Sequence, residues 1–488
     1  MHILKIWALR QWFFLFALVF VLALASYHFT TSPGFWFDEG IIAGVAKNIA
    51  LYGVYGTQVA PNSFFTNNFW ITNNFPVAFP VAAFFKILGV SIWTARLTPL
   101  FYLLGFVCVA YFFVKKIYGF KAAVLASLLL ITFNPLYGNG KAVLGEVPGL
   151  FWLILGGLLY LYYEGNKKVP FLLAAALSWG IAVSTKAYYL VFIPSTIFLA
   201  FFLLFRKKSI NYKFFFVPAV FFSLPILLWI FLAFNFNHFS FATLKNSVSY
   251  FLNSYGVSSF EPFKNLFRFV SESTPIHFTF LSIFIFAAWV IRRKKKAETL
   301  PLVYALFIFI ALSFFWYLKT PGWYRYFFSI HLLVILLFPA AFNEVTGKIG
   351  IVLKKENYTR WAGTGIMASL ILFQAGFLFF HYDDFYSTDV FQLKGYVEEN
   401  IKLDASIFVA SKPEVAFMLK NKNLYQYIFI SENLKIGENV IGKVPVGYVI
   451  TGSGDDPFVL KNADDIDKSY NLVYAVGHYR IYKLRAGS

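Results

Sequence analysis

Carboxylates are rare in most of this chain, and their positions single out a possible reaction centre. Only nine acidic residues occur before position 381 of the 488-residue chain. Asp38 and Glu39 directly follow three aromatic residues, 35–37, and Glu146 stands alone in a long apolar region. A carboxylate beside aromatic rings is partly desolvated, which raises its proton affinity and suits a general base. Asp38 is therefore a candidate catalytic base, and Glu39 and Glu146 are candidates for orienting an acceptor.

A structural explanation of the same acidic pair is equally open. Residues 40–52 are predicted to form a helix directly after Asp38 and Glu39. Carboxylates favour helix N-termini, where they meet unbonded N–H groups and the positive end of the helix dipole. Glu146 has a similar alternative, which is to pair only with Lys141.

The residue types that bind metals are scattered. His238 and His277 are isolated in the sequence, and His331 lies inside an apolar run. The single cysteine, Cys108, lies in another apolar run and allows no intrachain disulfide. A single histidine is more often a packed side chain than a ligand. We therefore expect no required metal or cofactor.

The scaffold that positions these side chains is predicted to be a membrane-embedded helical bundle. Hydrophobic residues make up 59% of the chain and charged residues 13%, about half the charged fraction of a soluble protein. This composition excludes a water-soluble enzyme, a disordered chain and a disulfide-rich secreted module. A helix needs about 20 mostly apolar residues to cross a bilayer. Eleven segments qualify, at 8–30, 97–114, 121–138, 147–163, 170–185, 187–205, 214–234, 276–291, 299–318, 324–342 and 362–380.

Basic residues predict how this bundle is oriented. One set of loops, which includes the N-terminal residues, contains 20 Lys and Arg residues, and the opposite, longer loops contain 10. Cytoplasmic loops carry the excess of Lys and Arg, so the N-terminus is predicted to be cytoplasmic and the C-terminus extracytoplasmic. The net charge of +19 is thereby explained by topology, and we expect no nucleic-acid partner.

The chain divides into two predicted domains. Residues 1–380 form the transmembrane domain, with a long outer loop at 31–96 that contains two stretches able to lie along the interface, 40–52 and 76–88. After residue 380 the composition changes to ordinary polarity. Residues 381–488 are predicted to form a small extracytoplasmic α/β domain. Its helical segments are expected at 389–401 and 413–420, and its strands at 405–410, 426–432, 444–451 and 471–484.

The order of motifs along this topology resembles the GT-C glycosyltransferases that use polyprenyl-phosphate sugars. These include the protein O-mannosyltransferases and the lipid A aminoarabinose transferases. The residues that carry the resemblance are Trp36-Phe37-Asp38-Glu39-Gly40, Ala46-Lys47-Asn48-Ile49, Gly53-Val54-Tyr55-Gly56, Ala95-Arg96-Leu97, Glu146-Val147-Pro148, Thr185-Lys186 and Tyr324-Arg325-Tyr326. Many relatives have Lys-Pro-Pro-Leu before the second interfacial helix, where this chain has residues 74–77, Asn-Phe-Pro-Val.

The resemblance implies an inverting transfer of a sugar from a polyprenyl-phosphate donor to a hydroxyl group of a glycan, lipid or protein acceptor. Asp38 would accept the proton of the attacking hydroxyl. The phosphate that leaves needs cationic partners at the outer face, and Arg96, Lys186 and Arg325 are the candidates. For each of the three, a side chain that snorkels at the end of a span is an equally open explanation.

Two other functions are compatible with a polytopic membrane protein. A transporter or flippase would be expected to carry inverted repeats and acidic groups at mid-membrane. In this chain the acidic groups gather at one predicted face, which disfavours transport. A catalytically silent relative that acts in assembly is disfavoured by the presence of Asp38.

Overall fold

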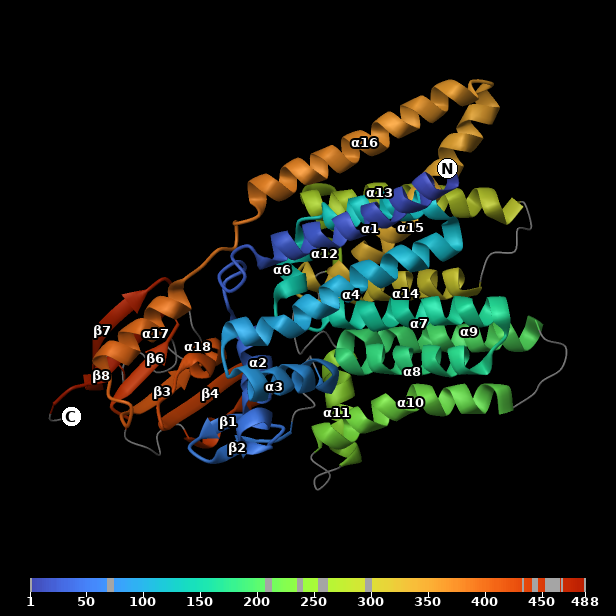
Figure 1. The fold of residues 1–488 in the computed structure, drawn as a ribbon. Coiled ribbons are helices and arrows are strands. Elements are labelled where there is room, and N and C mark those ends of the chain that lie inside the picture. The colour runs from blue at the N-terminus through green and yellow to red at the C-terminus, as the bar shows by residue number, and fades with distance from the viewer. Residues whose placement is uncertain are drawn as a thin grey trace.

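The fold consists of a long helical bundle and a smaller α/β domain at one end of it (Figure 1). The computed structural model describes residues 2–67, 74–206, 213–234, 240–252, 262–294, 301–431, 434–440, 446–452, 466 and 468–486. The bundle helices are α1 (His2–Ser26), α4 (Ile92–Tyr118), α5 (Phe120–Ile131), α6 (Pro135–Lys141), α7 (Glu146–Asn166), α8 (Val169–Thr185), α9 (Phe192–Arg206), α10 (Lys213–Ala233), α13 (Ser273–Lys294), α14 (Pro301–Tyr317), α15 (Arg325–Leu353) and α16 (Glu356–His381).

The predicted spans coincide with these helices. Six of the described helices are long and apolar enough to cross a membrane: α4, α7, α10, α13, α15 and α16. A seventh crossing is formed if α5 and α6 are counted as one broken span, and four shorter apolar helices cover the remaining predicted spans. The polytopic helical fold class is therefore confirmed. Helix α15 is the central element, because 89% of its apolar window is buried, against 17% in α10.

The third predicted span, 121–138, is not a continuous helix. Helices α5 and α6 are bent by 75° relative to each other. Pro135 has no N–H group to donate to the carbonyl of Ile131, four residues earlier, and the helix ends there. The hydroxyl of Tyr137 donates to that carbonyl instead, at 2.7 Å. The side-chain bond compensates for the lost backbone bond at the break.

The end of the molecule that carries the α/β domain contains two short helices, a hairpin and a six-stranded sheet (Figure 1). Helix α2 (Phe37–Tyr52) and helix α3 (Phe75–Leu88) flank the hairpin of β1 (Thr57–Ala60) and β2 (Ser63–Phe65). The sheet has the order β5-β4-β3-β6-β8-β7, in which β3 is parallel to β4 and β6 and the other pairs are antiparallel. Its members are β3 (Ser406–Ala410), β4 (Asn423–Ser431), β5 (Leu434–Ile436), β6 (Tyr448–Thr451), β7 (Tyr470–Val476) and β8 (Tyr479–Leu484).

The helices of the C-terminal domain are α17 (Asp389–Asn400) and α18 (Pro413–Met418). These elements agree with the predicted ones with two exceptions: the run 471–484 is a hairpin of two strands rather than one strand, and β5 was not predicted. Gly477 forms the turn with a φ of 52°, a left-handed conformation that glycine adopts readily. Two further helices, α11 (Phe241–Leu252) and α12 (Pro262–Ser271), follow α10 and precede α13 in the sequence.

The C-terminal domain shares its hydrophobic core with the loop 31–96. One cluster of buried side chains includes residues of α2, α3, α17 and α18 together with the central strands. Gly40 of α2 lies so close to α18 that a Cβ at this position would overlap the backbone of Glu414. The predicted boundary at residue 380 marks the change of composition, but the core extends across it into residues 37–95.

Candidate active site

The acidic pair lies in the first turn of α2, and its side chains do not act as the cap of that helix. The N-cap residue is Trp36, in an extended conformation, with Asp38 and Glu39 in the turn that follows. Both carboxylates form ion pairs with arginines from other helices. The capping explanation therefore does not account for these two side chains, although the start of a helix remains a favourable place for them.

Asp38 forms an ion pair with Arg325, the first residue of α15. Its side chain is 21% exposed and that of Arg325 is 12% exposed, so solvent reaches the pair. The guanidinium carbon lies 4.5 to 5.0 Å from the ring centroids of Trp36, Trp323 and Tyr326. Among the described residues, the buried Nε of Arg325 has no hydrogen-bond partner. Arg325 is thus surrounded by an aromatic cage and has one N–H group without a partner in the described chain.

Glu39 forms the second ion pair, with Arg96 of α4, and this pair is completely buried. The carboxylate lies 2.6 Å from the guanidinium and also accepts the backbone N–H of Val143 at 2.9 Å. Arg96 donates further to the carbonyls of Phe29 and Pro33, each at 2.9 Å. The pair joins α2, α4 and the chain that follows α6. This saturated geometry disfavours a direct contact between Arg96 and a donor phosphate.

Glu146, the first residue of α7, pairs with Lys186 at the end of α8. The alternative in which Glu146 pairs with Lys141 is wrong, because Lys141 donates to the carbonyl of Tyr27 at 3.0 Å and to the hydroxyl of Tyr382 at 2.7 Å. The side chains of Glu146 and Lys186 are both almost fully buried. Within the described chain, Oε2 of Glu146 is buried without a partner, so this pair is less satisfied than that of Glu39.

Asn74 is a polar residue of this region that the sequence analysis noted only as part of the segment 74–77 and did not make a site candidate. It is fully buried, and its backbone N–H donates to the carbonyl of Thr185, the residue before Lys186. Neither polar atom of its side chain has a partner among the residues described. The difference between residues 74–77 and Lys-Pro-Pro-Leu, noted in the sequence, is the signal that could have drawn attention to it.

The two described histidines that seemed isolated in the sequence are neighbours in space. His277 Nδ1 and His331 Nε2 lie 2.9 Å apart, and His331 Nδ1 lies 3.0 Å from the hydroxyl of Tyr324. Gln374 completes this buried network from α16, with its Nε2 at 3.0 Å from His277 Nε2. In the described part of the chain, no group of three or more His, Cys, Asp or Glu residues could hold a metal ion. His238 lies outside the described residues.

The structure therefore pairs the predicted site residues one to one. Each of the three acidic candidates, Asp38, Glu39 and Glu146, faces one of the three basic candidates. The sequence separated these residues into a catalytic group and a phosphate-binding group, whereas the fold brings the two groups together. The pairs differ in exposure, and only the pair of Asp38 with Arg325 is open to solvent.

Comparisons with known proteins agree with this architecture. The family model described as dolichyl-phosphate-mannose-protein mannosyltransferase matches residues 64–243. The chain is similar in structure to ArnT from Cupriavidus metallidurans bound to undecaprenyl phosphate, with a TM-score of 0.66 and 14% identity over 98% of both chains. It is also similar to the Archaeoglobus fulgidus oligosaccharyltransferase, with a TM-score of 0.58 and 14% identity over 91% of this chain and 69% of the other. No curated protein sequence matches the chain significantly. The GT-C fold predicted from the sequence is thus confirmed.

Proposed function

We propose that this chain is a membrane glycosyltransferase that moves a sugar from a polyprenyl-phosphate donor to a hydroxyl acceptor at the outer face of the membrane. The observation that carries the proposal is the solvent-accessible pair of Asp38 and Arg325. It places a carboxylate and a guanidinium side by side at the junction of the bundle with the outer domain. Transfer from a lipid phosphate requires both groups, one for the proton of the acceptor and one for the phosphate.

Asp38 acts as the general base in this proposal. The adjacent guanidinium favours the ionised carboxylate, which is the form that accepts a proton. The sequence instead predicted a carboxylate desolvated by the aromatic residues 35–37. The proton moves from the acceptor hydroxyl to Asp38 as the oxygen attacks the anomeric carbon and the bond from that carbon to the phosphate oxygen breaks.

Arg325 binds the phosphate of the donor. Its partly exposed guanidinium can donate to a phosphate oxygen while one N–H group stays with Asp38. The aromatic rings around it hold the guanidinium plane in one orientation, which reduces the entropy lost on binding. A phosphate at this position would lie beside the base, so the leaving group and the attacking hydroxyl would be held in one site.

We assign the pair of Lys186 and Glu146 to substrate orientation, together with Asn74, whose backbone N–H donates to Thr185 beside Lys186. Lys186 offers a cation for the phosphate, and the unpaired Oε2 of Glu146 can accept a hydroxyl of the sugar or of the acceptor. The amide of Asn74 can both donate and accept. Arg96 is assigned a positioning role, since it holds Glu39 and hence the first turn of α2 in place.

Two measurements on the purified protein test the proposal. The first is sugar transfer with polyprenyl-phosphate mannose as the donor. The second is binding of undecaprenyl phosphate, an analogue of the lipid product. We expect release of the lipid phosphate that depends on Asp38, and binding of undecaprenyl phosphate that depends on Arg325. Movement of the intact donor across vesicle membranes, with no release of lipid phosphate, would favour the flippase alternative. Lipid binding without either activity would favour the silent relative.

The sidedness of the site is tested separately. The sheet domain lies at the end of the bundle opposite the N-terminal end of α1 (Figure 1), which supports an N-terminus and a C-terminal domain on different sides of the membrane. Exposed Asn400 of α17 and Glu356 at the start of α16 are suitable positions for cysteine in a Cys108→Ser background. We expect an impermeant thiol reagent to label Asn400→Cys in intact cells and Glu356→Cys only after lysis.

A further inference from the structure

The segment that carries Asp38 contacts the C-terminal domain on both sides of this residue. Before it, the backbone N–H of Gly34 donates to the carbonyl of Phe385 at 2.8 Å. The backbone N–H of Ser387 donates back to the carbonyl of Thr31 at 2.9 Å. These two bonds join the entry to α2 to the linker between α16 and α17. The chain that leads into the catalytic turn is therefore attached, through its backbone, to the start of the C-terminal domain.

The side chain of Ser387 lies directly against Gly34. A Cβ at position 34 would come within 2.8 Å of the Cβ of Ser387, whereas carbon atoms that are not bonded pack at about 3.5–4.0 Å. The next residue, Phe35, is buried, and its ring centroid lies 5.4 Å from that of Phe417 in α18. Contact with the C-terminal domain thus continues toward the first turn of α2.

Gly40 makes the contact on the other side of Asp38. A Cβ at this position would overlap the backbone N and Cα of Glu414, and it would lie 2.6 Å from the carbonyl carbon of Pro413. These atoms belong to the backbone of the first turn of α18, so a change of side-chain rotamer cannot relieve the overlap. The absence of a side chain at Gly40 therefore sets how closely the two helices approach.

The first turn of α18 is in turn attached to the six-stranded sheet. The Glu414 carboxylate accepts a hydrogen bond from the hydroxyl of Tyr479 in β8, at 3.1 Å. Just before the helix, the backbone N–H of Ser411 donates to the carbonyl of Tyr427 in β4, at 2.7 Å. The surface on which Gly40 rests thus has a fixed place in the C-terminal domain.

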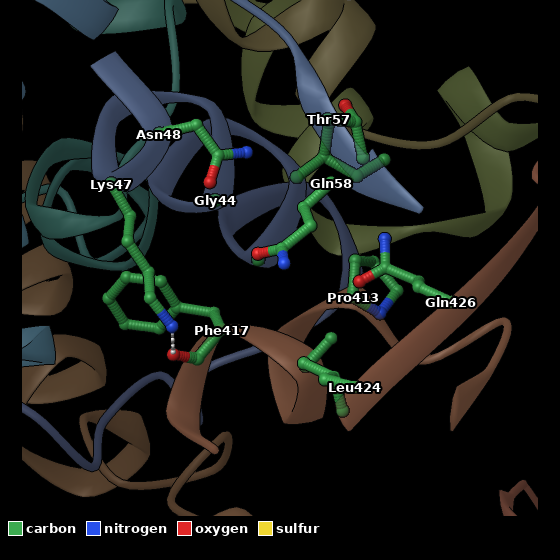
Figure 2. Close-up of a pocket in the computed structure, with 12 residues that line it drawn as sticks. Gly44, Lys47, Asn48, Thr57, Gln58, Pro413, Phe417, Leu424 and Gln426 are labelled. Carbon is green, nitrogen blue, oxygen red and sulfur yellow. Dashed lines mark hydrogen bonds between the residues drawn. The ribbon is translucent and has the colours of Figure 1, made fainter. Parts of the chain in front are cut away.

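The second half of α2 is bonded to the opposite end of α18. The Nζ of Lys47 donates to the carbonyls of Phe417 and Leu419 at 3.1 and 3.3 Å, and Figure 2 shows the first of these bonds. Both carbonyls lie at the C-terminal end of α18, where a cation is favourable. Helix α18 therefore lies along α2 and contacts it at both of its ends.

We propose that the C-terminal domain positions the catalytic carboxylate, and that Gly34 and Gly40 are the positioning residues through which it acts. The two glycines flank Asp38, and each admits a part of the C-terminal domain that a side chain would exclude. A misplacement of about 1 Å can lower the rate of a catalytic site by about 100-fold, so the position of this turn matters for turnover. The inference rests on the proposed role of Asp38. It gives the C-terminal domain a part in turnover, although none of its groups is assigned to the reaction.

Gly40→Ala tests the contact with α18, and Gly44→Ala is the matched control. Both substitutions add one methyl group to α2, one helical turn apart, but a Cβ at Gly44 meets no described atom within 4 Å. We expect Gly40→Ala to lower turnover of saturating polyprenyl-phosphate mannose by about 10- to 100-fold. Its affinity for undecaprenyl phosphate should change little, and Gly44→Ala should resemble the wild type. Turnover is expressed per binding site for undecaprenyl phosphate, so that unfolded protein does not contribute.

The contact at Gly34 allows a rescue experiment that does not depend on the folding of the Gly40→Ala protein. Gly34→Ala should lower turnover, because the added Cβ overlaps that of Ser387. Ser387→Gly removes the obstructing atom, so the double variant should regain most of the lost turnover. The single Ser387→Gly protein supplies the reference rate for the double variant.

Amide hydrogen exchange over residues 36–44 provides a readout that requires no transfer. When α18 is displaced, the first turns of α2 lose part of their packing, and their amides open more often. We expect faster exchange of this segment in Gly40→Ala than in the wild type or in Gly44→Ala.

Several results would overturn the positioning role. These are normal turnover in both Gly40→Ala and Gly34→Ala, an equal loss in Gly44→Ala, or a loss in Gly34→Ala that Ser387→Gly does not reverse. If the wild type transfers no sugar, the proposed function fails and hydrogen exchange alone decides the positioning. In that case, unchanged exchange in Gly40→Ala would overturn it, and faster exchange would support it.

Discussion

Asp38 and Glu39 are consecutive in the sequence, yet the structure gives them opposite environments. Glu39 and Arg96 have no exposed surface, and carbonyls and a backbone N–H supply their remaining bonds. Asp38 and Arg325 are partly exposed, and Arg325 keeps a donor without a partner in the described chain. A saturated buried pair supports the fold, whereas an accessible and incompletely bonded pair can exchange its partners for a substrate.

The difference follows from helix geometry. Consecutive residues of a helix point about 100° apart. In the first turn of α2, Asp38 therefore faces α15 while Glu39 faces α4. The comparison shows that a pair of acidic residues in a sequence motif need not share one role. It also predicts that substitution of Asp38 changes turnover, whereas substitution of Glu39 changes the stability of the fold.

Asp38→Asn should produce the largest change, and it should act on turnover. Loss of a general base lowers the rate by about 10²- to 10⁴-fold. The measurement is release of lipid phosphate from polyprenyl-phosphate mannose under saturating donor. The melting temperature and the binding of undecaprenyl phosphate serve as controls, and both should change little. Near-normal turnover would show that Asp38 is not the base.

Glu39→Ala should act on stability instead. Removal of one partner leaves Arg96 as an unpaired buried charge, which costs about 3–5 kcal/mol. The measurement is thermal or denaturant unfolding of the purified protein. In the double variant Glu39→Leu, Arg96→Met the buried charges are absent, so much of the stability should return. A Glu39→Ala protein as stable as the wild type would contradict the structural role.

Arg325→Ala should weaken the binding of undecaprenyl phosphate. Hydrogen bonds to charged groups contribute about 1.5–3 kcal/mol, which corresponds to a loss of affinity of roughly 10- to 150-fold. Arg325→Lys should restore little, because an ammonium lacks the planar fork that fits the aromatic cage and the phosphate together. Arg96→Lys tests whether Arg96 differs from Arg325 in its role. This substitution should lower the stability of the fold more than the affinity for undecaprenyl phosphate. The reverse result would indicate that the phosphate binds at Arg96.

Lys47 of α2 should give the smallest effect. It extends the comparison to a half-buried cation, whose Nζ donates to the carbonyls of Phe417 and Leu419. Burial lowers the pKa of Lys47 from 10.5 to about 8. Between these values the unfolded chain binds more protons than the folded protein, so the stability contributed by Lys47 rises with pH from about 8 to 10.5. The stability of the wild type relative to Lys47→Met should therefore increase between pH 7.5 and 10. A difference that does not change with pH would contradict the lowered pKa.

The sequence alone was sufficient for most of the architecture. Composition and the length of the apolar runs predicted the helical bundle, since a chain with so few charges can satisfy its backbone in a membrane only by forming helices. The elements of the C-terminal domain followed from their periodicity. The break at Pro135 was also readable from the missing N–H group, although the span around it was predicted as continuous. The acidic and basic site candidates came from their scarcity and from the motif order.

The tertiary structure alone decided which of these residues meet. Arg96 is 57 residues from Glu39, Lys186 is 40 residues from Glu146, and Arg325 is 287 residues from Asp38. Helical periodicity relates only residues within a few turns, so no spacing in the sequence indicates these pairs. The tertiary fold sets them, since the pairs join α2 to α4, α2 to α15, and α7 to the end of α8. The same fold buried the carboxylate of Glu39 and left that of Asp38 accessible, because exposure depends on the assembled helices and not on the motif.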